Sequence, residues 1–441
     1  MTKPNILFIL IDSMRADKFF LNKKHLQFKK LIDQGVYFEQ NISPSDYTVT
    51  GIGSIFTGCY PFDAGLKAQS YQKLYSNNSN YVEFLKQNGY HAYTTMAESV
   101  AELGFSKLFD NVDQTYPNSL RLFDGLGEKI INFLKSKTLE KPWFYFIHLE
   151  DLHLPVSLPS KYEHVKYSER YDIAISEIHS WINKIIQLVD LKNTLVVITS
   201  DHGDYIPSID DSKNSNQNIL RTKSVLRDKI PSKIYDKLSS TKRSFATNIQ
   251  KFKTTSKYEK RAIETRTGKN RYLYDEIIRT PLLFFGYDIK PNKIVKQQVR
   301  SIDIFPTLVD IIGIEKINFS VHGQSLKPLL KNKTISEFPV YLESTVFATI
   351  QKNAIPHLGI RTPQFKYFRR VDNPKESIHL YDLVNDPFEE NNIFSKNQNI
   401  VFKMEEEILK IKKNNSMPVL EDLDDSETKK VEDELRKLGY I

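Results

Sequence analysis

Four side chains of this sequence combine the ligands of a metal site with a hydroxyl nucleophile. Asp12 ends the apolar run NILFILID, and Asp201 and His202 follow the apolar residues of TLVVITSDHGD. Thr48 lies between the two runs, in the segment SPSDYTVTGIGSIFTG. Two carboxylates and an imidazole suit a divalent cation, and a hydroxyl beside that cation can act as a nucleophile. The combination predicts transfer or hydrolysis of an anionic ester.

A parallel sheet is the element that would bring these distant side chains together. The carboxyl ends of parallel strands meet at one edge of the sheet, where open α/β folds bind their ligands. The continuous apolar run WFYFIHL at 143–149 is typical of a strand buried on both faces. Further strands are predicted at 5–12, 91–96, 194–200 and 282–286, and helices at 25–36, 81–89, 171–190 and 301–314. This alternation predicts an α/β fold with a mostly parallel central sheet that helices flank on both faces.

The sequence pattern changes from about residue 335. Short alternating segments, IRTPQFKYFRRV and ESIHLYDLV, predict a small antiparallel sheet, and charged helices finish the chain. We therefore expect a catalytic domain at 1–330 and a C-terminal subdomain at 331–441.

A basic insertion is expected at about 205–268 within the catalytic domain. Between Asp211 and Arg271 there are 17 Lys or Arg and 5 Asp or Glu residues, whereas the whole chain carries a net charge of +8. The stretch has few apolar residues, and partial helix is predicted at 230–238. It is interpreted either as a solvated surface excursion or as a lid that gathers an acidic substrate.

Length and composition set limits on the class of protein. A chain of 441 residues is long enough for a large core and two domains. Its apolar runs are shorter than the roughly 20 residues that cross a bilayer, and the first strand begins too early for a signal peptide. A cytoplasmic location is therefore expected. The single cysteine, Cys59, excludes an internal disulfide framework and is interpreted as a packing residue.

Several segments resemble, in order, the landmarks of the sulfatase family within the alkaline phosphatase superfamily. NILFILIDSMRAD resembles the opening strand and metal-binding Asp, FTGCYPFDAG the turn after the nucleophile, and TSDHGD the second metal-binding segment. The later landmarks are YLYDEIIRTPLLFFG, SIDIFPTLVDIIGI, HGQSLKPLL, KYFRRV, ESIHLYDLVNDPFEENNI and VEDELRKLGYI. The resemblance spans the chain from end to end.

The position of the nucleophile departs from that family. Sulfatases carry a Cys or Ser in a C/S-x-P-x-R context and convert it to formylglycine. Thr48 falls at this position, and neither the Pro nor the Arg is present. Because the β-carbon of threonine carries a methyl group, it cannot become an aldehyde. Direct attack by the Thr48 hydroxyl remains, as in phosphatases, phosphodiesterases and phosphotransferases; the alternative is that Thr48 only caps a helix beginning at Val49 or Thr50.

The resemblance also implies a single-metal site. Asp12, Asp201, His202 and Thr48 would hold one divalent ion, with Mn²⁺ or Zn²⁺ favoured and Ca²⁺ as a further option. The family's first strand usually offers two Asp residues, whereas here Ser13 follows Asp12. The alternative interpretation is that Asp201 and His202 only stabilise a turn.

Further residues carry over from the resemblance. His153, in DLHLPV, resembles the substrate-facing His of the H-x-P-Y segment and is expected to protonate the leaving group or bind the anion. Lys269 falls where family members carry an anion-binding Lys, although a surface lysine is the competing interpretation. His148 is interpreted as a core histidine. Arg15 is expected to support the site, and Asp17 is interpreted as structural.

These observations predict a metal-dependent hydrolase or transferase that acts on a phosphoester through a covalent Thr48 intermediate. The alternatives are a sulfuric ester hydrolase that uses the same site and a pseudoenzyme that binds a polyanion. The expected substrate is a small-molecule, polysaccharide or lipid-linked anionic ester. The stretch between Asp211 and Arg271 offers only four aromatic residues among its lysines, Tyr235, Phe245, Phe252 and Tyr258, which argues against nucleic acid as a partner. The sequence does not define the oligomeric state.

Overall fold

The computed structural model contains two β-sheets. It describes residues 3–20, 28–62, 80–102, 105–111, 113–136, 138–154, 156–206, 256–267, 270–314, 317, 320–344 and 354–413. One sheet has eight strands and the other has four. Most of the basic insertion, its expected helix at 230–238 and the final segment 414–441 lie outside the described residues.

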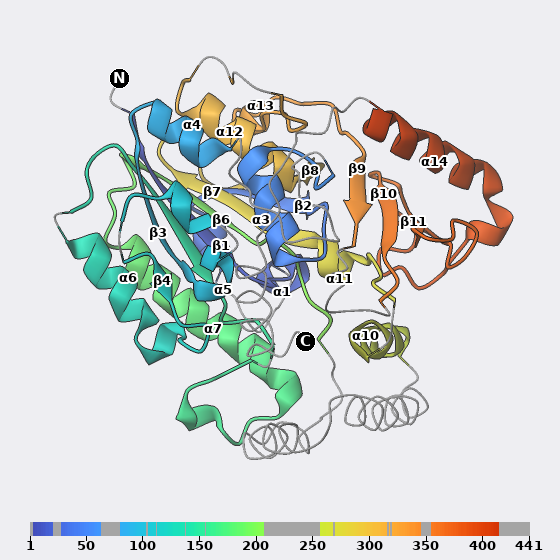
Figure 1. The fold of residues 1–441 in the computed structure, drawn as a ribbon, viewed down its shortest axis with the longest axis horizontal. Coiled ribbons are helices and arrows are strands. Elements are labelled where there is room, and N and C mark those ends of the chain that lie inside the picture. The colour runs from blue at the N-terminus through green and yellow to red at the C-terminus, as the bar shows by residue number, and fades with distance from the viewer. Residues whose placement is uncertain are drawn as a thin grey trace.

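The eight-stranded sheet forms the centre of the fold (Figure 1). Its order is β4 (Thr115–Tyr116), β3 (His91–Ala97), β5 (Trp143–Leu149), β1 (Asn5–Ile11), β6 (Thr194–Thr199), β7 (Arg279–Gly286), β2 (Gly35–Ile42) and β8 (Lys293–Arg300). β4, β3, β5, β1 and β6 pair in parallel, as do β2 and β8. β7 runs antiparallel to both β6 and β2. The predicted mostly parallel sheet is therefore confirmed, with one reversed strand.

Helices cover both faces of this sheet (Figure 1). Beside one face lie α6 (Leu126–Lys135) and α7 (Tyr167–Ile186). Beside the other lie α3 (Thr48–Thr57), α4 (Tyr81–Gln87), α12 (Ile304–Ile311) and α13 (Lys327–Leu330). The remaining described α-helices are α1 (Ala16–Phe20), α2 (Lys29–Ile32), α5 (Glu98–Glu102), α10 (Lys257–Thr267), α11 (Asp275–Ile278) and α14 (Gln398–Lys413). None of the helices in the described ranges is long and apolar enough to cross a membrane.

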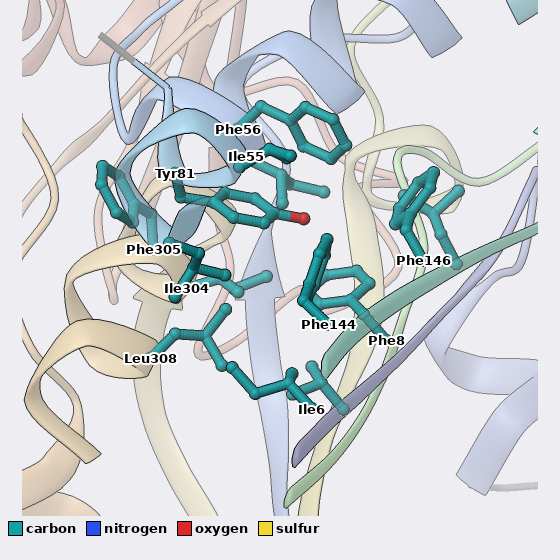
Figure 2. Packing of buried hydrophobic residues seen from close by; sticks show 14 of the residues in the cluster. Ile6, Phe8, Ile55, Phe56, Tyr81, Phe144, Phe146, Ile304, Phe305 and Leu308 are labelled. Carbon is teal, nitrogen blue, oxygen red and sulfur yellow. The ribbon is translucent and has the colours of Figure 1, made fainter. Parts of the chain in front are cut away.

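Aromatic packing fixes α3 against the sheet. Phe56 of α3 has its ring centroid 5.1 Å from that of Phe146 on β5 and 4.7 Å from that of Tyr81 on α4. Phe8 on β1 lies 5.7 Å from Phe146, and Figure 2 shows these rings converging with Phe144 in one cluster. Buried aromatic rings contribute large apolar areas and prefer such tilted or edge-to-face contacts. This packing holds the helix that begins with Thr48 above the central strands.

The four-stranded sheet forms a second layer towards the C-terminus. Its order is β12 (His379–Asp382), β11 (Phe365–Arg370), β10 (His357–Arg361) and β9 (Val340–Glu343), and every pairing is antiparallel. The predicted antiparallel sheet is confirmed, and α14 lies beside it (Figure 1). The domain boundary at 330 stays a prediction.

The expected helix at 25–36 is wrong at its C-terminal end. α2 ends at Ile32, and β2 begins at Gly35. A Cβ atom added to Gly35 would lie 2.1 Å from the carbonyl oxygen of Phe284 on β7. The glycine is therefore required for close approach of two strands, and it does not terminate a helix.

Candidate metal and nucleophile site

Two neighbouring parallel strands deliver the candidate metal ligands to the same edge of the sheet. Asp12 directly follows β1, and Asp201 follows β6 after Ser200. The two strands pair in register, with Leu10 opposite Thr199. Because both chains leave the sheet at its carboxyl edge, residues 189 positions apart in sequence become neighbours, as the strand pattern predicted.

Thr48 is the first residue of α3 and does not cap the helix. The residue before the helix is Tyr47, which has extended backbone angles, and it makes no side-chain cap hydrogen bond. The cap interpretation of Thr48 is therefore wrong. Thr50 faces elsewhere, since its Oγ1 donates to the Tyr47 carbonyl (3.1 Å) and hydrogen-bonds Ser45. The Thr48 side chain thus remains available to the site.

Glycine residues let the three segments of the site approach one another. A Cβ atom added to Gly51 of α3 would lie 2.8 Å from the carbonyl oxygen of Asp201. A Cβ atom added to Gly203 would lie 2.1 Å from the carbonyl oxygen of Glu276. The Gly203 N–H also donates to the carbonyl of Ile277 at 2.6 Å. Side chains at either position would push the loop that carries Asp201 away from its neighbours.

The polar atoms of the site converge on the Thr48 hydroxyl. Its Oγ1 donates to Asp12 Oδ2 at 3.2 Å and lies 3.2 Å from His202 Nε2. His202 Nε2 is 3.9 Å from Asp12 Oδ1 and 3.5 Å from Asp201 Oδ2. Its Nδ1 lies 2.7 Å from the carbonyl oxygen of Gly203. With Nδ1–H donating to that carbonyl, Nε2 faces the side where Thr48 and both carboxylates meet, and once its proton is released it offers a lone pair to a cation.

The donor set fits a divalent cation. One ligand atom from each of Asp12, Asp201 and His202 lies within 4.8 Å of the others, and all three side chains are buried. Asp201 Oδ2 has no hydrogen-bond donor, although the side chain is fully buried. A buried carboxylate oxygen normally has a partner, so a cation is the natural occupant of this position. These three residues, with the Thr48 hydroxyl, would hold the ion; the identity of that ion stays open.

Ser13 clamps the two carboxylates from one side. Its Oγ donates to Asp12 Oδ1 at 2.7 Å, and its N–H donates to Asp201 Oδ1 at 3.3 Å. Ser13 has a φ of 62°, a left-handed conformation that is uncommon outside glycine. The Tyr171 hydroxyl fixes this turn by donating to the Ser13 carbonyl at 2.7 Å. Where sulfatases have a second Asp, this chain has a residue that orients the first one.

His148 is more than a core histidine. The ring is fully buried on β5, opposite Leu10 of β1, and its Nε2 lies 3.3 Å from Asp12 Oδ2. The expected core placement is correct, but the contact with Asp12 was not foreseen. The sequence did contain one sign of this contact. His148 is a polar residue near the carboxyl end of the apolar run WFYFIHL, and the carboxyl ends of parallel strands face the same sheet edge as Asp12.

The site has a strong negative field that favours cations. Burial acts to raise the pKa of Asp12, but the hydrogen bond from His148 and the positive charge of His202 lower it overall. Burial and the charge of Asp12 raise the pKa of Asp201. Burial disfavours charge on His202, yet Asp201 and Asp12 raise its pKa to about 9. The field that holds a proton on His202 would also attract a metal ion to the same nitrogen.

His153 lies at the same edge of the sheet, beyond β5. Only 7% of the residue is exposed. Burial lowers the pKa of His153 to about 4, against the opposing charges of Asp12 and Asp204. At neutral pH the ring is therefore uncharged, which suits binding of an oxygen through its N–H better than donation of a proton. The expected role in protonating the leaving group stays a prediction.

The structure shows the surroundings of two further residues that the sequence analysis named, Arg15 and Asp17. Arg15 pairs with Asp17 at 2.8 Å and donates to the hydroxyl of Tyr258 at 2.6 Å and to the carbonyl of Asp204 at 3.4 Å. Arg15 therefore ties the first turn after β1 to the loop after His202 and to α10. Asp17 has the expected structural role of pairing with Arg15. Lys269 lies outside the described residues.

Family models match most of the chain. The model described as Sulfatase matches residues 4–314, and the model described as N-sulphoglucosamine sulphohydrolase, C-terminal, matches residues 264–414. The chain belongs to the sulfatase family, as its motifs predicted.

Curated relatives share short segments with this chain. Arylsulfatase K of Mus musculus is 31% identical over 163 residues, which are 36% of this chain and 29% of the relative. An N-acetylglucosamine-6-O-sulfatase of Bacteroides thetaiotaomicron is 32% identical over 134 residues, 29% of this chain and 23% of the relative. The matched segments thus span less than a third of either relative. Their names support an ester hydrolase.

Solved structures share the fold over nearly the whole chain. The phosphonate monoester hydrolase of Agrobacterium radiobacter has a TM-score of 0.66 and 14% identity, covering 93% of this chain and 96% of that one. A 2-O GAG sulfatase has a TM-score of 0.65 and 17% identity, covering 96% and 95%. At these identities the likeness shows the fold alone. The same fold thus occurs in a sulfatase and in a phosphonate monoester hydrolase.

Proposed function

We propose that this chain is a metal-dependent hydrolase that cleaves a phosphoester through a covalent intermediate on Thr48. The single observation that carries the proposal is the position of the Thr48 hydroxyl. Its Oγ1 lies 3.2 Å from both Asp12 Oδ2 and His202 Nε2, at the N-terminus of α3. A helix N-terminus presents free N–H groups to an anion, so the substrate and the nucleophile would meet there.

The reaction proceeds in two displacement steps. When bound, a divalent cation lowers the pKa of the Thr48 hydroxyl and neutralises charge on the transferring group. Thr48 Oγ1, which is oriented by its hydrogen bond to Asp12 Oδ2, loses its proton to water and attacks the phosphorus atom. The bond to the leaving oxygen breaks, and the electron pair departs with that oxygen, which takes a proton from water. Water then attacks the phosphorus of the ester on Thr48, which releases phosphate and restores the hydroxyl.

A sulfuric ester is the second candidate substrate. Relatives that are named as sulfatases support it, and the fold shared with a phosphonate monoester hydrolase supports the phosphoester. Threonine cannot form the aldehyde of a formylglycine enzyme, so a sulfate would also have to be displaced directly by Thr48. Direct displacement is the chemistry of phosphoryl transfer, and for this reason we place the phosphoester first. If a hydroxyl replaces water in the second step, the enzyme is a transferase.

A carbohydrate ester is the substrate class that we propose. Relatives include an N-acetylglucosamine-6-O-sulfatase and an ulvan-active sulfatase, and one solved structure of this fold holds D-glucosamine-2-N,6-O-disulfate as its substrate. These substrates belong to the named proteins, and we extend their chemical class to this chain as a proposal. Two further expectations are proposals that do not depend on the substrate class. One is that the protein is cytoplasmic, and the other is that the basic insertion attracts an acidic substrate.

The test is an ester screen with matched variants of Thr48. Metal-loaded protein is assayed with p-nitrophenyl phosphate, bis-p-nitrophenyl phosphate, p-nitrophenyl phenylphosphonate and p-nitrophenyl sulfate. Thr48→Val keeps the shape of the side chain and removes the hydroxyl, so turnover should fall by at least about a thousandfold. Thr48→Ser keeps a hydroxyl and should retain measurable turnover. Activity of Thr48→Val close to wild type would contradict the proposal.

A further inference from the structure

A tyrosine hydroxyl joins the two segments that carry the proposed metal ligands. Tyr258 lies in the first turn of α10, and its hydroxyl donates to the carbonyl of Ile206 at 2.9 Å. The same oxygen accepts the Ile206 N–H at 3.2 Å and Nη1 of Arg15 at 2.6 Å. Ile206 lies in the loop that continues from His202, whereas Arg15 lies in the turn that continues from Asp12. The hydroxyl therefore connects the loop after β6 to the turn after β1.

These contacts occupy the hydrogen-bonding groups of the hydroxyl. A phenolic oxygen donates through its O–H and accepts through its lone pairs. The O–H goes to Ile206, and the lone pairs take the N–H groups of Ile206 and Arg15. The guanidinium carbon of Arg15 also lies 5.3 Å from the centroid of the Tyr258 ring. Loss of the oxygen would therefore break all of these hydrogen bonds at once, while the ring could stay in place.

The turn after β1 passes this restraint on to the carboxylates. The Tyr171 hydroxyl accepts the Arg15 N–H at 3.1 Å and donates to the Ser13 carbonyl at 2.7 Å. Ser13 in turn donates to Asp12 from its Oγ and to Asp201 from its N–H. The Arg15 side chain thus belongs to a short hydrogen-bonded turn that ends at the two carboxylates.

The loop after β6 is restrained by the same arginine and by a second anchor. Arg15 Nη1 donates to the carbonyl of Asp204 at 3.4 Å. Further along, the Gly203 N–H donates to the carbonyl of Ile277 at 2.6 Å. Because this second anchor does not involve Tyr258, loss of the tyrosine oxygen should shift the loop without unfolding it.

The helix α10 is held by contacts with the C-terminal part of the chain. Arg261 lies one turn after Tyr258, and its Nη1 donates to the carbonyls of Phe388 and Glu389 at 2.8 and 3.1 Å. Its guanidinium carbon also lies 4.5 Å from the ring centroid of Tyr274. These contacts fix α10 from the side away from the loop after β6. The Tyr258 hydroxyl is therefore presented to the metal site by a helix with its own anchors.

The relative position of the two segments decides how well an ion can be held. Asp201 and His202 come from the loop after β6, whereas Asp12 comes from the turn after β1. One ligand atom from each lies within 4.8 Å of the others. Residues that orient ligands affect metal affinity because an ion tolerates only small changes in such distances. A hydroxyl that bridges both segments is placed to keep those distances short.

We propose that Tyr258 is a positioning residue of the metal site. Its hydroxyl holds the loop of Asp201 and His202 against the turn of Asp12, and it thereby raises the affinity for a divalent ion. The inference rests on the metal-binding part of the proposed function and not on the nature of the ester. It adds that metal affinity depends on α10, a helix that supplies none of the proposed ligands.

Metal titration of a variant without the hydroxyl tests the inference. Tyr258→Phe keeps the ring and removes its oxygen. Titration of the apoprotein with Mn²⁺ or Zn²⁺ should show an affinity about tenfold or more below that of wild type, as is typical when a residue that orients a ligand is lost. Turnover of the preferred aryl ester should need more metal for its half-maximal rate. At saturating metal the rate should approach that of wild type, because Thr48 and the proposed ligands are unchanged.

Tyr90→Phe is the matched control. The Tyr90 hydroxyl donates to the carbonyl of Pro4 at 2.9 Å, at the opposite edge of the sheet, where β1 begins. This variant also loses a hydrogen bond from a tyrosine hydroxyl to a backbone carbonyl, and it should bind metal like wild type. Wild-type metal affinity in Tyr258→Phe, or an equal loss of affinity in both variants, would overturn the positioning role.

A second variant covers the case in which Tyr258→Phe does not fold, which thermal melting of the apoprotein would show. Arg15→Lys keeps a positive charge beside Asp17 and loses the planar fork that reaches Tyr258 and Asp204. It should also weaken metal binding, measured by the same titration. Unchanged affinity in a folded Arg15→Lys variant would count against the link between the two segments.

The positioning role and the proposed function fail in different ways. If wild type hydrolyses none of the esters while Tyr258→Phe still binds metal more weakly, the proposed function fails and the positioning role stands. If wild type hydrolyses an ester and Tyr258→Phe binds metal as tightly as wild type, the positioning role fails alone. A wild-type protein that binds no divalent ion would contradict both.

Discussion

The Thr48 hydroxyl and the Asp12 carboxylate are 3.2 Å apart, although they are 36 residues apart in sequence. Asp12 is fixed by β1, whereas Thr48 is fixed by α3, which packs on the sheet through Phe56. The relationship joins the proposed nucleophile to a proposed metal ligand.

Removal of one metal ligand should remove the ion without unfolding the sheet. Asp201→Asn lowers the negative charge around Asp201 Oδ2, which has no donor, so the affinity for a divalent ion should fall by at least about a hundredfold. His202→Ala should act in the same direction. Elemental analysis after dialysis measures the ion, with exposed Asp190→Asn as the control. Equal metal content in wild type and both ligand variants would contradict the site.

His148 should act on the metal through Asp12. His148→Phe removes the Nε2 contact at 3.3 Å and keeps an aromatic ring in the fully buried position on β5. Metal affinity should fall by about tenfold to a hundredfold, as is typical when a residue that orients a ligand is lost. Titration of the apoprotein with Mn²⁺ or Zn²⁺ measures this. His148→Gln, which can still donate a hydrogen bond, should recover part of the affinity; unchanged affinity in His148→Phe would show that Asp12 needs no such support.

Gly51 should be required for the register between α3 and the metal loop. The Cβ atom in Gly51→Ala would lie 2.8 Å from the carbonyl oxygen of Asp201 and 3.0 Å from its Cβ. The helix must therefore shift, and a displacement of about 1 Å at a reacting group can lower the rate about a hundredfold. Alanine favours a helix by about 1 kcal/mol over glycine, and this gain offsets the cost of the steric clash. The melting temperature should therefore change little. Wild-type kcat/KM in this variant would be inconsistent with the close contact.

The residues at the strand ends could be predicted from the sequence more easily than the contacts that support those residues. Asp12, Asp201 and His202 follow apolar runs, so their meeting at one sheet edge could be foreseen. The contact of His148 with Asp12 depends on which strand lies beside β1, and no local pattern reports strand order. β2 was not predicted, because GVYFEQNI has only a short apolar stretch and follows directly on a helical pattern.

A chain of neutral histidines in the C-terminal sheet should make stability depend on pH. Tyr381 hydrogen-bonds His379 Nδ1 at 3.0 Å, and Ser377 Oγ lies 3.1 Å from both His379 Nε2 and His357 Nε2. His357 Nδ1 donates to the carbonyl of Ile355 at 3.1 Å, so the chain uses both rings uncharged. Burial lowers the pKa of His357 to about 4 and that of His379 to about 3.

The sign of this dependence follows from the unfolded histidines, whose pKa is about 6.5. Above that pH neither state is protonated, and the full stability is present. As the pH falls from about 6.5 towards 4, the unfolded chain takes up protons first, so stability falls by up to about 1.4 kcal/mol per pH unit for each histidine. Urea unfolding of apoprotein across this range measures the slope. His357→Gln should flatten it, and an identical slope would exclude His357 as a source.

Trapping the covalent ester tests the central claim most directly. Metal-loaded protein is mixed with its preferred aryl ester, quenched in acid within one turnover, digested and examined by mass spectrometry. We expect a phosphoryl or sulfuryl group on Thr48 in wild type and no modification in Thr48→Val; the exact mass of the group identifies the ester class. A modified residue other than Thr48, or single-turnover hydrolysis by Thr48→Val at the wild-type rate, would contradict it.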